Sequence, residues 1–271
     1  MSNKPETSKA TAAHEAFMGD LSTALENDQF FLVYQPEIDL HTNAFAGVEA
    51  LLRWRHPEQG IVNPDSFVPA LEAQGLIVAV GSWALSTACA QGSEWHDKGY
   101  RFSVALNISP LQFEWPAFVS QVEEALDSSR FPASLLVLEF AQSTLTSNYG
   151  EQLSALKDLG VRLAIDDFEP GSSQLDDLAT SPVDIVKLDR KFIASMSQSG
   201  AAADLVHSLV AAAKGLHLQI VASGIEDDDQ RRRLQLEDVA IGQGFHFSKP
   251  HEAAEIDRYL EDFSIFSGKP L

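Results

Sequence analysis

Short apolar runs alternate with amphipathic stretches along most of the chain. The apolar runs predict strands at 30–38, 44–54, 102–109, 135–141, 161–168, 184–189, 218–225 and 239–247. Helical patterns fall at 14–27, 66–75, 80–99, 116–128, 149–160, 172–180, 201–216 and 227–237. Strands that stay apolar through most of their length are typical of a parallel sheet whose outer face is covered by helices.

Around eight strand–helix units without a linker between them predict one α/β domain, a (β/α)8 barrel. An open, doubly wound sheet is the alternative fold, but no predicted strand is followed by G-x-G-x-x-G or G-x-x-x-x-G-K-[ST]. We expect the barrel to occupy residues 14–262, with a flexible, polar N-terminal tail at 1–13 and a C-terminal tail at 263–271.

The chain is strongly acidic, with a formal net charge of −20 over 271 residues. This charge disfavours DNA and RNA, which normally need a basic face, and favours divalent cations or a basic protein partner. A small anionic nucleotide remains compatible if local cations or metals neutralise it. The single cysteine, Cys89, excludes an internal disulfide framework and every multi-cysteine metal site. Since no apolar run could span a bilayer and the start lacks a signal-peptide pattern, we expect no membrane segment and a cytoplasmic location.

Polar side chains stand at the ends of the predicted strands, where a barrel of this kind places its chemistry. In chain order they are Glu49, Asn107, Glu139, Asp166, Asp167, Lys187, Asp189, Glu226 and Gln243. Carboxylates that converge on one rim repel each other unless cations bind, and oxygen-only ligation suits Mg²⁺ or Mn²⁺. The adjacent Asp166 and Asp167 suit a pair of metal ions that activates water for a phosphodiester displacement. Lys187 either serves a phosphate or the water, or is a barrel lysine paired with a neighbouring acid.

Six stretches in a fixed order carry a resemblance to a known family. They are YQPEIDL at 34–40, VEALLRWRHPEQG at 48–60, NIS at 107–109, DDF at 166–168, VKLDRKFI at 186–193 and GQGFHFSKP at 242–250. With them the chain resembles the EAL domain family over roughly residues 20–260. The resemblance implies a modified, TIM-like (β/α)8 barrel that binds cyclic di-GMP and often dimerises. In active members it also implies Mg²⁺- or Mn²⁺-dependent hydrolysis of cyclic di-GMP to the linear dinucleotide pGpG.

The resemblance also implies roles for individual residues. Ligands of a first metal would be Glu49, Asn107, Glu139 and Asp166. Asp166 would also bridge to a second metal bound by Asp167. Catalytic positions would be Lys187, near the attacking water, Glu226 and Gln243, and contacts to the nucleotide would come from Gln35, Arg53 and Asp189.

Three positions depart from the family pattern. The stretch VASGIED at 221–227 stands where the family has a sequence close to VAEGVET, so Ser223 replaces a glutamate that serves the second metal and is a candidate general base. Gln142 replaces a glutamate that anchors the loop after the two aspartates, and Glu169 replaces a glycine within that loop. A positioned base is typically worth about 10²–10⁴-fold in rate. We therefore expect the first metal site to be better retained than the second.

Three hypotheses follow. The leading one is a degenerate EAL domain that acts as a cyclic di-GMP receptor or a protein-interaction regulator, with absent or weak hydrolysis. The second is an active metal-dependent phosphodiesterase with an altered site, in which water or Glu226 substitutes for the missing carboxylate. The third is an interaction protein that no longer binds nucleotide. A protein partner or a homodimer is compatible with each of them.

Overall fold

The structure, a computed structural model, describes residues 16–144, 149–168, 178–179, 181–196 and 200–267, without the side chains of 200–203 and 263–267. Within these ranges, none of the helices has the length and apolar character needed to cross a membrane.

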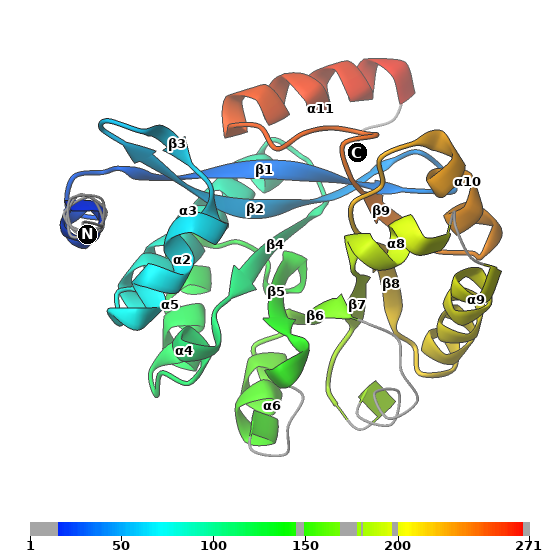
Figure 1. Cartoon of the computed structure of the whole chain (residues 1–271), viewed down its shortest axis with the longest axis horizontal. Coiled ribbons are helices and arrows are strands. Elements are labelled where there is room, and N and C mark those ends of the chain that lie inside the picture. Colours follow the sequence, from blue (N-terminus) through cyan, green and yellow to red (C-terminus); the bar gives the residue numbers. More distant parts are fainter. Residues whose placement is uncertain (1–15, 145–148, 169–177, 180, 197–199, 268–271) are drawn as a thin grey trace, which may run out of the picture.

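One sheet of nine strands forms the centre of the molecule (Figure 1). Its strands are β1 (Phe30–Asp39), β2 (Phe45–His56), β3 (Gly60–Val62), β4 (Ser103–Ile108), β5 (Leu136–Ala141), β6 (Arg162–Phe168), β7 (Ile185–Leu188), β8 (Gln219–Ala222) and β9 (Ile241–Gln243). The order is β1-β9-β8-β7-β6-β5-β4-β2-β3, and β1 also pairs with β2. Pairing of β1 with both β9 and β2 closes an eight-stranded barrel, so the predicted barrel is confirmed.

The barrel differs from a regular (β/α)8 barrel at its first strand. β1 runs antiparallel to both of its neighbours, whereas the pairs from β2 through β4 to β9 are parallel. The short β3, which the sequence did not predict, folds back on β2 as a hairpin. This is the modification that the resemblance implied.

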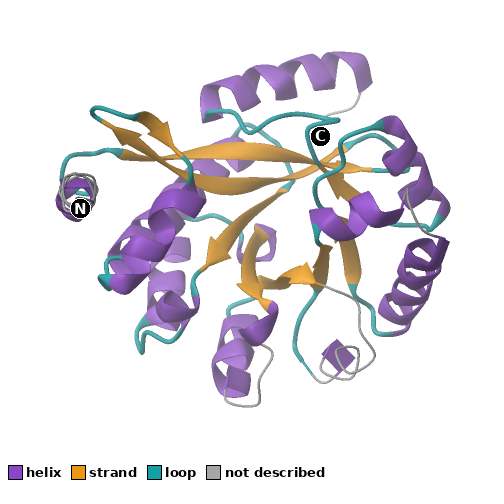
Figure 2. Cartoon of the chain, in the orientation of Figure 1, coloured by secondary structure: helices purple, strands orange, loops and turns teal. Residues whose placement is uncertain are grey.

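Helices surround the strands on the outside of the barrel (Figure 2). They are α2 (Pro64–Ala73), α3 (Ile77–Asp97), α4 (Pro110–Phe113), α5 (Phe118–Ser129), α6 (Gly150–Asp158), α8 (Arg190–Met196), α9 (Gly200–Gly215), α10 (Asp228–Leu236) and α11 (Ala253–Ser267), with residues 16–23 also helical. The sequence did not predict α4, α8 or α11. The helix predicted at 172–180 falls almost wholly outside the described residues. Helix α11, which lies beside β1 (Figure 1), continues past residue 262, where the sequence predicted a tail.

The barrel interior is built in layers by the period-2 alternation of its strands. One buried apolar cluster has one member from each of six successive strands: Ala105, Val137, Ala164, Ile185, Val221 and Ile241. Two residues further along each strand the side chain returns to the same face of the sheet. The residues at that next level are Asn107, Glu139, Asp166, Lys187, Ser223 and Gln243. Thus the pleat that buries the apolar layer also places a polar layer directly beyond it.

Candidate functional site

Eight polar side chains, which we call the polar ring, lie at the carboxyl end of the barrel. β1 and β2 contribute Gln35 and Glu49, which are paired in register, and the six residues of the next level complete the set. Each barrel strand, or the residue directly after it, thereby supplies one member. The member from β8 is Ser223, where the resemblance implies a carboxylate.

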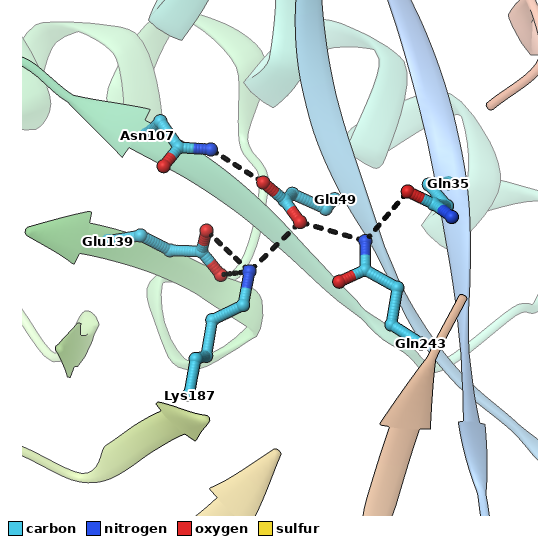
Figure 3. A network of polar contacts seen from close by, with 6 residues as sticks. All are labelled: Gln35, Glu49, Asn107, Glu139, Lys187 and Gln243. Atoms are coloured by element: carbon cyan, nitrogen blue, oxygen red, sulfur yellow. Dashed lines mark hydrogen bonds and ion pairs between the residues drawn. The ribbon is translucent and has the colours of Figure 1, made fainter. Parts of the chain in front are cut away.

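Lys187 connects the centre of the polar ring (Figure 3). Its ammonium group donates to Oε2 of Glu49 at 2.9 Å and to Oε1 and Oε2 of Glu139 at 2.6 and 2.7 Å. Only 1% of Lys187 is exposed, and Glu139 is equally inaccessible at 2%. Lys187 is therefore paired with acids, and its charge is offset within the protein. A role toward a phosphate or the attacking water stays a prediction.

Two amides complete the contacts of Glu49. Nδ2 of Asn107 donates to its Oε1 at 2.6 Å, and Nε2 of Gln243 donates to its Oε2 at 2.8 Å. The same Gln243 nitrogen lies 3.3 Å from Oε1 of Gln35 (Figure 3). Because these contacts join β1, β2, β4 and β9, they hold the Glu49 carboxylate at one orientation.

The charges in this cluster shift each other's pKa. Burial disfavours the charged form of Lys187, but Glu139 and Glu49 hold its pKa well above the ordinary value. Burial also opposes ionisation of Glu49, and the Lys187 ammonium with the two amide donors nevertheless lowers the pKa of that carboxyl. Burial and the neighbouring Glu49 carboxylate raise the pKa of Glu139. Two buried carboxyl groups, Glu49 and Glu139, thus share the single positive charge of Lys187.

A pocket of about 250 Å³ opens at the polar ring. Its lining contains Gln35, Glu49, Asp166, Asp167, Lys187, Arg190, Ser223, Glu226, Gln243 and Phe245. Small-ligand sites are concave and have a few convergent polar groups, and this pocket shares that character.

The paired aspartates stand where β6 departs from regular geometry. The register of β6 against β7 shifts between Ile165 and Phe168, and Asp167 has a φ of 51°. Left-handed backbone is uncommon for a residue other than glycine and is concentrated at functional sites. Desolvation and the Asp166 carboxylate raise the pKa of Asp167. Both aspartates belong to the pocket lining, and their role toward a pair of metal ions stays a prediction.

The pocket lining also contains Ser223 and an ion pair. The backbone N–H of Ser223 donates to the carbonyl of Leu188 and so extends the β7–β8 pairing. Its hydroxyl is buried and finds no hydrogen-bond partner in the described part of the chain. Beside it, the Arg190 guanidinium pairs with the Glu226 carboxylate. The Glu226 carboxylate, expected in a catalytic role, is therefore held by a cation that the sequence analysis did not single out.

The residues expected at the first metal fit a hard cation by their chemistry. Glu49, Asn107, Glu139 and Asp166 offer only oxygen donors to a metal and come from adjacent strands. However, among the described residues no three or more His, Cys, Asp or Glu side chains are arranged to hold a metal ion. The Lys187 ammonium group lies against oxygens of two of the expected ligands, Glu49 and Glu139.

Two residues expected to contact a nucleotide lie outside the pocket lining. Arg53, on β2, is half-buried, and its Nη1 donates to the carbonyl of Leu52. Asp189 follows β7, and its Oδ1 accepts from the backbone N–H groups of Lys191 and Phe192 at the start of α8. Gln142 is half-buried in the short helix Gln142–Thr144, whereas Glu169 lies outside the described residues. The nucleotide roles of Arg53 and Asp189 stay predictions.

Sequence reasoning missed two residues of the pocket, Arg190 and Phe245. Both lie within quoted family stretches, VKLDRKFI and GQGFHFSKP. Their positions just after β7 and β9 were the available signal, because strand ends feed the site in such barrels. Phe245 is 61% exposed although it is a large apolar residue.

The closed barrel with a polar ring at the carboxyl end of its strands defines the chain as a modified α/β-barrel protein. The chain belongs to the EAL domain family, which matches residues 18–250. The bifunctional diguanylate cyclase/cyclic di-GMP phosphodiesterase MucR of Pseudomonas aeruginosa is 38% identical over 241 residues, 88% of this chain and 35% of MucR. The cyclic di-GMP phosphodiesterase PdeR of Escherichia coli is 34% identical over 247 residues, 90% of this chain and 37% of PdeR. The chain therefore spans about a third of the length of these curated relatives.

Solved structures show the same architecture. The PaMucR phosphodiesterase in a c-di-GMP complex has a TM-score of 0.83 and 37% identity, covering 88% of this chain and 98% of that one. The EAL enzyme Bd1971, in a form with bound cAMP and cyclic di-GMP, has a TM-score of 0.86 and 26% identity. The match covers 92% of this chain and 69% of the Bd1971 chain. These similarities extend over nearly the whole barrel.

Proposed function

We propose that this chain is a degenerate EAL domain that binds cyclic di-GMP and hydrolyses it weakly or not at all. The observation that carries this proposal is the β8 wall of the pocket, where a serine hydroxyl stands at the position of an expected carboxylate. The binding half of the proposal is supported by the retained pocket and by the similarity to a relative whose structure contains c-di-GMP.

The proposed weakness of hydrolysis has two physical reasons. Ser223 is a neutral hydroxyl, so it neither accepts a proton from water readily nor holds a hard dication as a carboxylate does. The neighbouring Glu226 is the obvious substitute, but its carboxylate is paired with the Arg190 guanidinium.

The proposed site offers more ligands to a first metal ion than to a second. A first Mg²⁺ or Mn²⁺ would be held by Glu49, Asn107, Glu139 and Asp166 of the polar ring. A second would have only Asp166 and the adjacent Asp167. Bound, such ions stabilise the charge that develops on phosphate and lower the pKa of bound water. Lys187 would position Glu49 and Glu139, because it already bonds to both.

The test is formation of pGpG by high concentrations of the protein with cyclic di-GMP and Mn²⁺ or Mg²⁺. Ser223→Glu is assayed in parallel, with Ser86→Glu as the matched control, since Ser86 is an exposed residue of α3. We expect little product from the unmodified protein and from Ser86→Glu, and an increase of about 10²-fold or more with Ser223→Glu. Turnover by the unmodified protein at an ordinary enzymatic rate would refute the degenerate interpretation.

One observation favours the second hypothesis, an active phosphodiesterase. The expected first-metal ligands Glu49, Asn107 and Glu139 do converge in the structure, and Gln243 joins them (Figure 3). If water fills the place of the missing carboxylate, this half of the site would still act on the phosphodiester. The comparison of the unmodified protein with Ser223→Glu separates the hypotheses, because an active enzyme would gain little from the added carboxylate.

A further inference from the structure

The pocket is acidic, although the proposed ligand is an anion. Four carboxyl groups line it, Glu49, Asp166, Asp167 and Glu226, against two cationic groups, Lys187 and Arg190. The charge of Lys187 is buried and already taken by Glu49 and Glu139. Among the described lining residues, Arg190 is therefore the cation that remains accessible, with 65% of its side chain exposed.

Arg190 is held in position by its surroundings. Its aliphatic stem packs against Gly224, where an added Cβ would lie 2.4 Å from Cγ and 2.5 Å from Cβ of the arginine. Gly224 also has a φ of +76°, which favours glycine. The guanidinium bonds to Glu226 through one nitrogen, Nη2, and within the described part of the chain its other N–H groups are available to a second acceptor. Contacts at both ends thus orient a planar donor at the pocket.

Ser223 offers a second donor on the same wall. Its Oγ is buried, has no hydrogen-bond partner among the described residues, and belongs to the pocket lining. A hydroxyl donates to a phosphate oxygen, whereas an ionised glutamate at this position would repel it. The exchange of an acid for serine therefore changes this wall from a metal-ligating surface to one that accepts an anion directly.

We propose that Arg190 and Ser223 form a direct phosphate-binding wall, so that the chain binds cyclic di-GMP without a metal ion. This inference rests on the proposed binding function and specifies how that site neutralises its ligand. A guanidinium is suited to this role because it makes two parallel bonds to phosphate oxygens. Glu226 orients the arginine and limits the net positive charge of the wall.

The experiment is a calorimetric titration of the full chain with cyclic di-GMP, in EDTA and in excess Mg²⁺. We expect the affinity in EDTA to lie within about threefold of that in Mg²⁺, less than the loss of one charged hydrogen bond would cause. In EDTA, Arg190→Ala should weaken binding about tenfold or more, and Ser223→Ala by several-fold. Arg190→Lys keeps the positive charge but lacks the paired N–H donors of the guanidinium, so its affinity should lie between those of wild type and Arg190→Ala.

Two further variants make the test specific. Arg233→Ala removes an exposed arginine of α10 that pairs with Asp229 outside the pocket, so its affinity should equal that of wild type. Ser223→Glu returns a carboxylate to the wall and should make binding dependent on Mg²⁺. Melting curves of all variants check folding, which the loss of an exposed ion pair should hardly change.

The outcomes separate this inference from the proposed function. Binding that EDTA abolishes and Mg²⁺ restores would overturn the direct wall and leave the receptor function standing. Equal affinity of wild type and Arg190→Ala in EDTA would also overturn it. The absence of binding in both buffers would overturn the wall and the proposed function together.

Discussion

Replacement of Glu37 by glutamine should stabilise the protein at alkaline pH. Glu37 is 6% exposed and lines a cavity of about 50 Å³ inside the barrel, on the other side of Lys187 from the pocket. Burial raises its pKa to about 7, Lys187 and Arg162 partly offset that effect, and Glu49 adds to it. A neutral, isosteric amide removes the cost of ionising this group.

The magnitude follows from the shift of the Glu37 pKa. The ordinary value is 4.5 and the folded value about 7, a difference worth about 3 kcal/mol. Because the folded state keeps a proton that the unfolded chain releases between these values, wild type loses stability as pH rises from about 4.5 to 7 and does not regain it above 7. Glu37→Gln lacks this loss.

The assay is urea unfolding of wild type and Glu37→Gln at pH values from 5 to 9. We expect the free energy of unfolding of the variant, relative to wild type, to increase by about 2.5 kcal/mol between pH 5 and pH 8. If the substitution also loses a contact in the cavity, the free energy of unfolding changes by the same amount at every pH, and the dependence on pH stays as expected. Glu123→Gln, at an exposed position of α5, is the control and should show no such change. A difference between Glu37→Gln and wild type that is the same at every pH would refute the reasoning.

Three further predictions concern the polar ring, its wall and the core. Lys187→Met leaves Glu49 and Glu139 buried without their cation and should cost about 3–5 kcal/mol in urea unfolding at pH 7, whereas a loss below 1 kcal/mol would contradict the ion-pair assignment. Gly224→Ala adds a Cβ at positive φ against the Arg190 stem, so both stability and cyclic di-GMP affinity should fall; unchanged affinity would show that the stem is not held there. Burial raises the pKa of the Cys89 thiol to about 12, so a thiol reagent at pH 8 should react only as urea unfolds the chain, and rapid reaction of the native protein would argue against a buried position.

Local alternation explains why the barrel and most of the polar ring could be predicted from the sequence. In β5, for example, Val137 and Glu139 are two residues apart and so share one face whatever the surroundings. The same spacing joins Ile185 to Lys187 in β7. The sequence also showed Ser223 at the end of a strand, because the apolar run before it marked where the strand stops.

Contacts between distant strands were beyond this reasoning. The bonds from Lys187 to Glu139 and Glu49 cross 48 and 138 positions of the chain, and the antiparallel direction of β1 depends on where its neighbours lie. Likewise, Glu37 is an acid whose burial is visible only after the barrel closes around it. Periodicity describes which face a side chain occupies and carries no information about which strand comes next to it.

The sequence by itself predicted the barrel, most of the polar side chains at its strand ends and a serine at 223, where the resemblance implies a carboxylate. Only the tertiary structure decided that buried acids neutralise Lys187, that Arg190 pairs with Glu226, and that Arg190 and Ser223 line one pocket. The physical reason is that charge and hydrogen bonding act through distances of a few ångströms in space, which closure of the barrel sets and the order of residues does not.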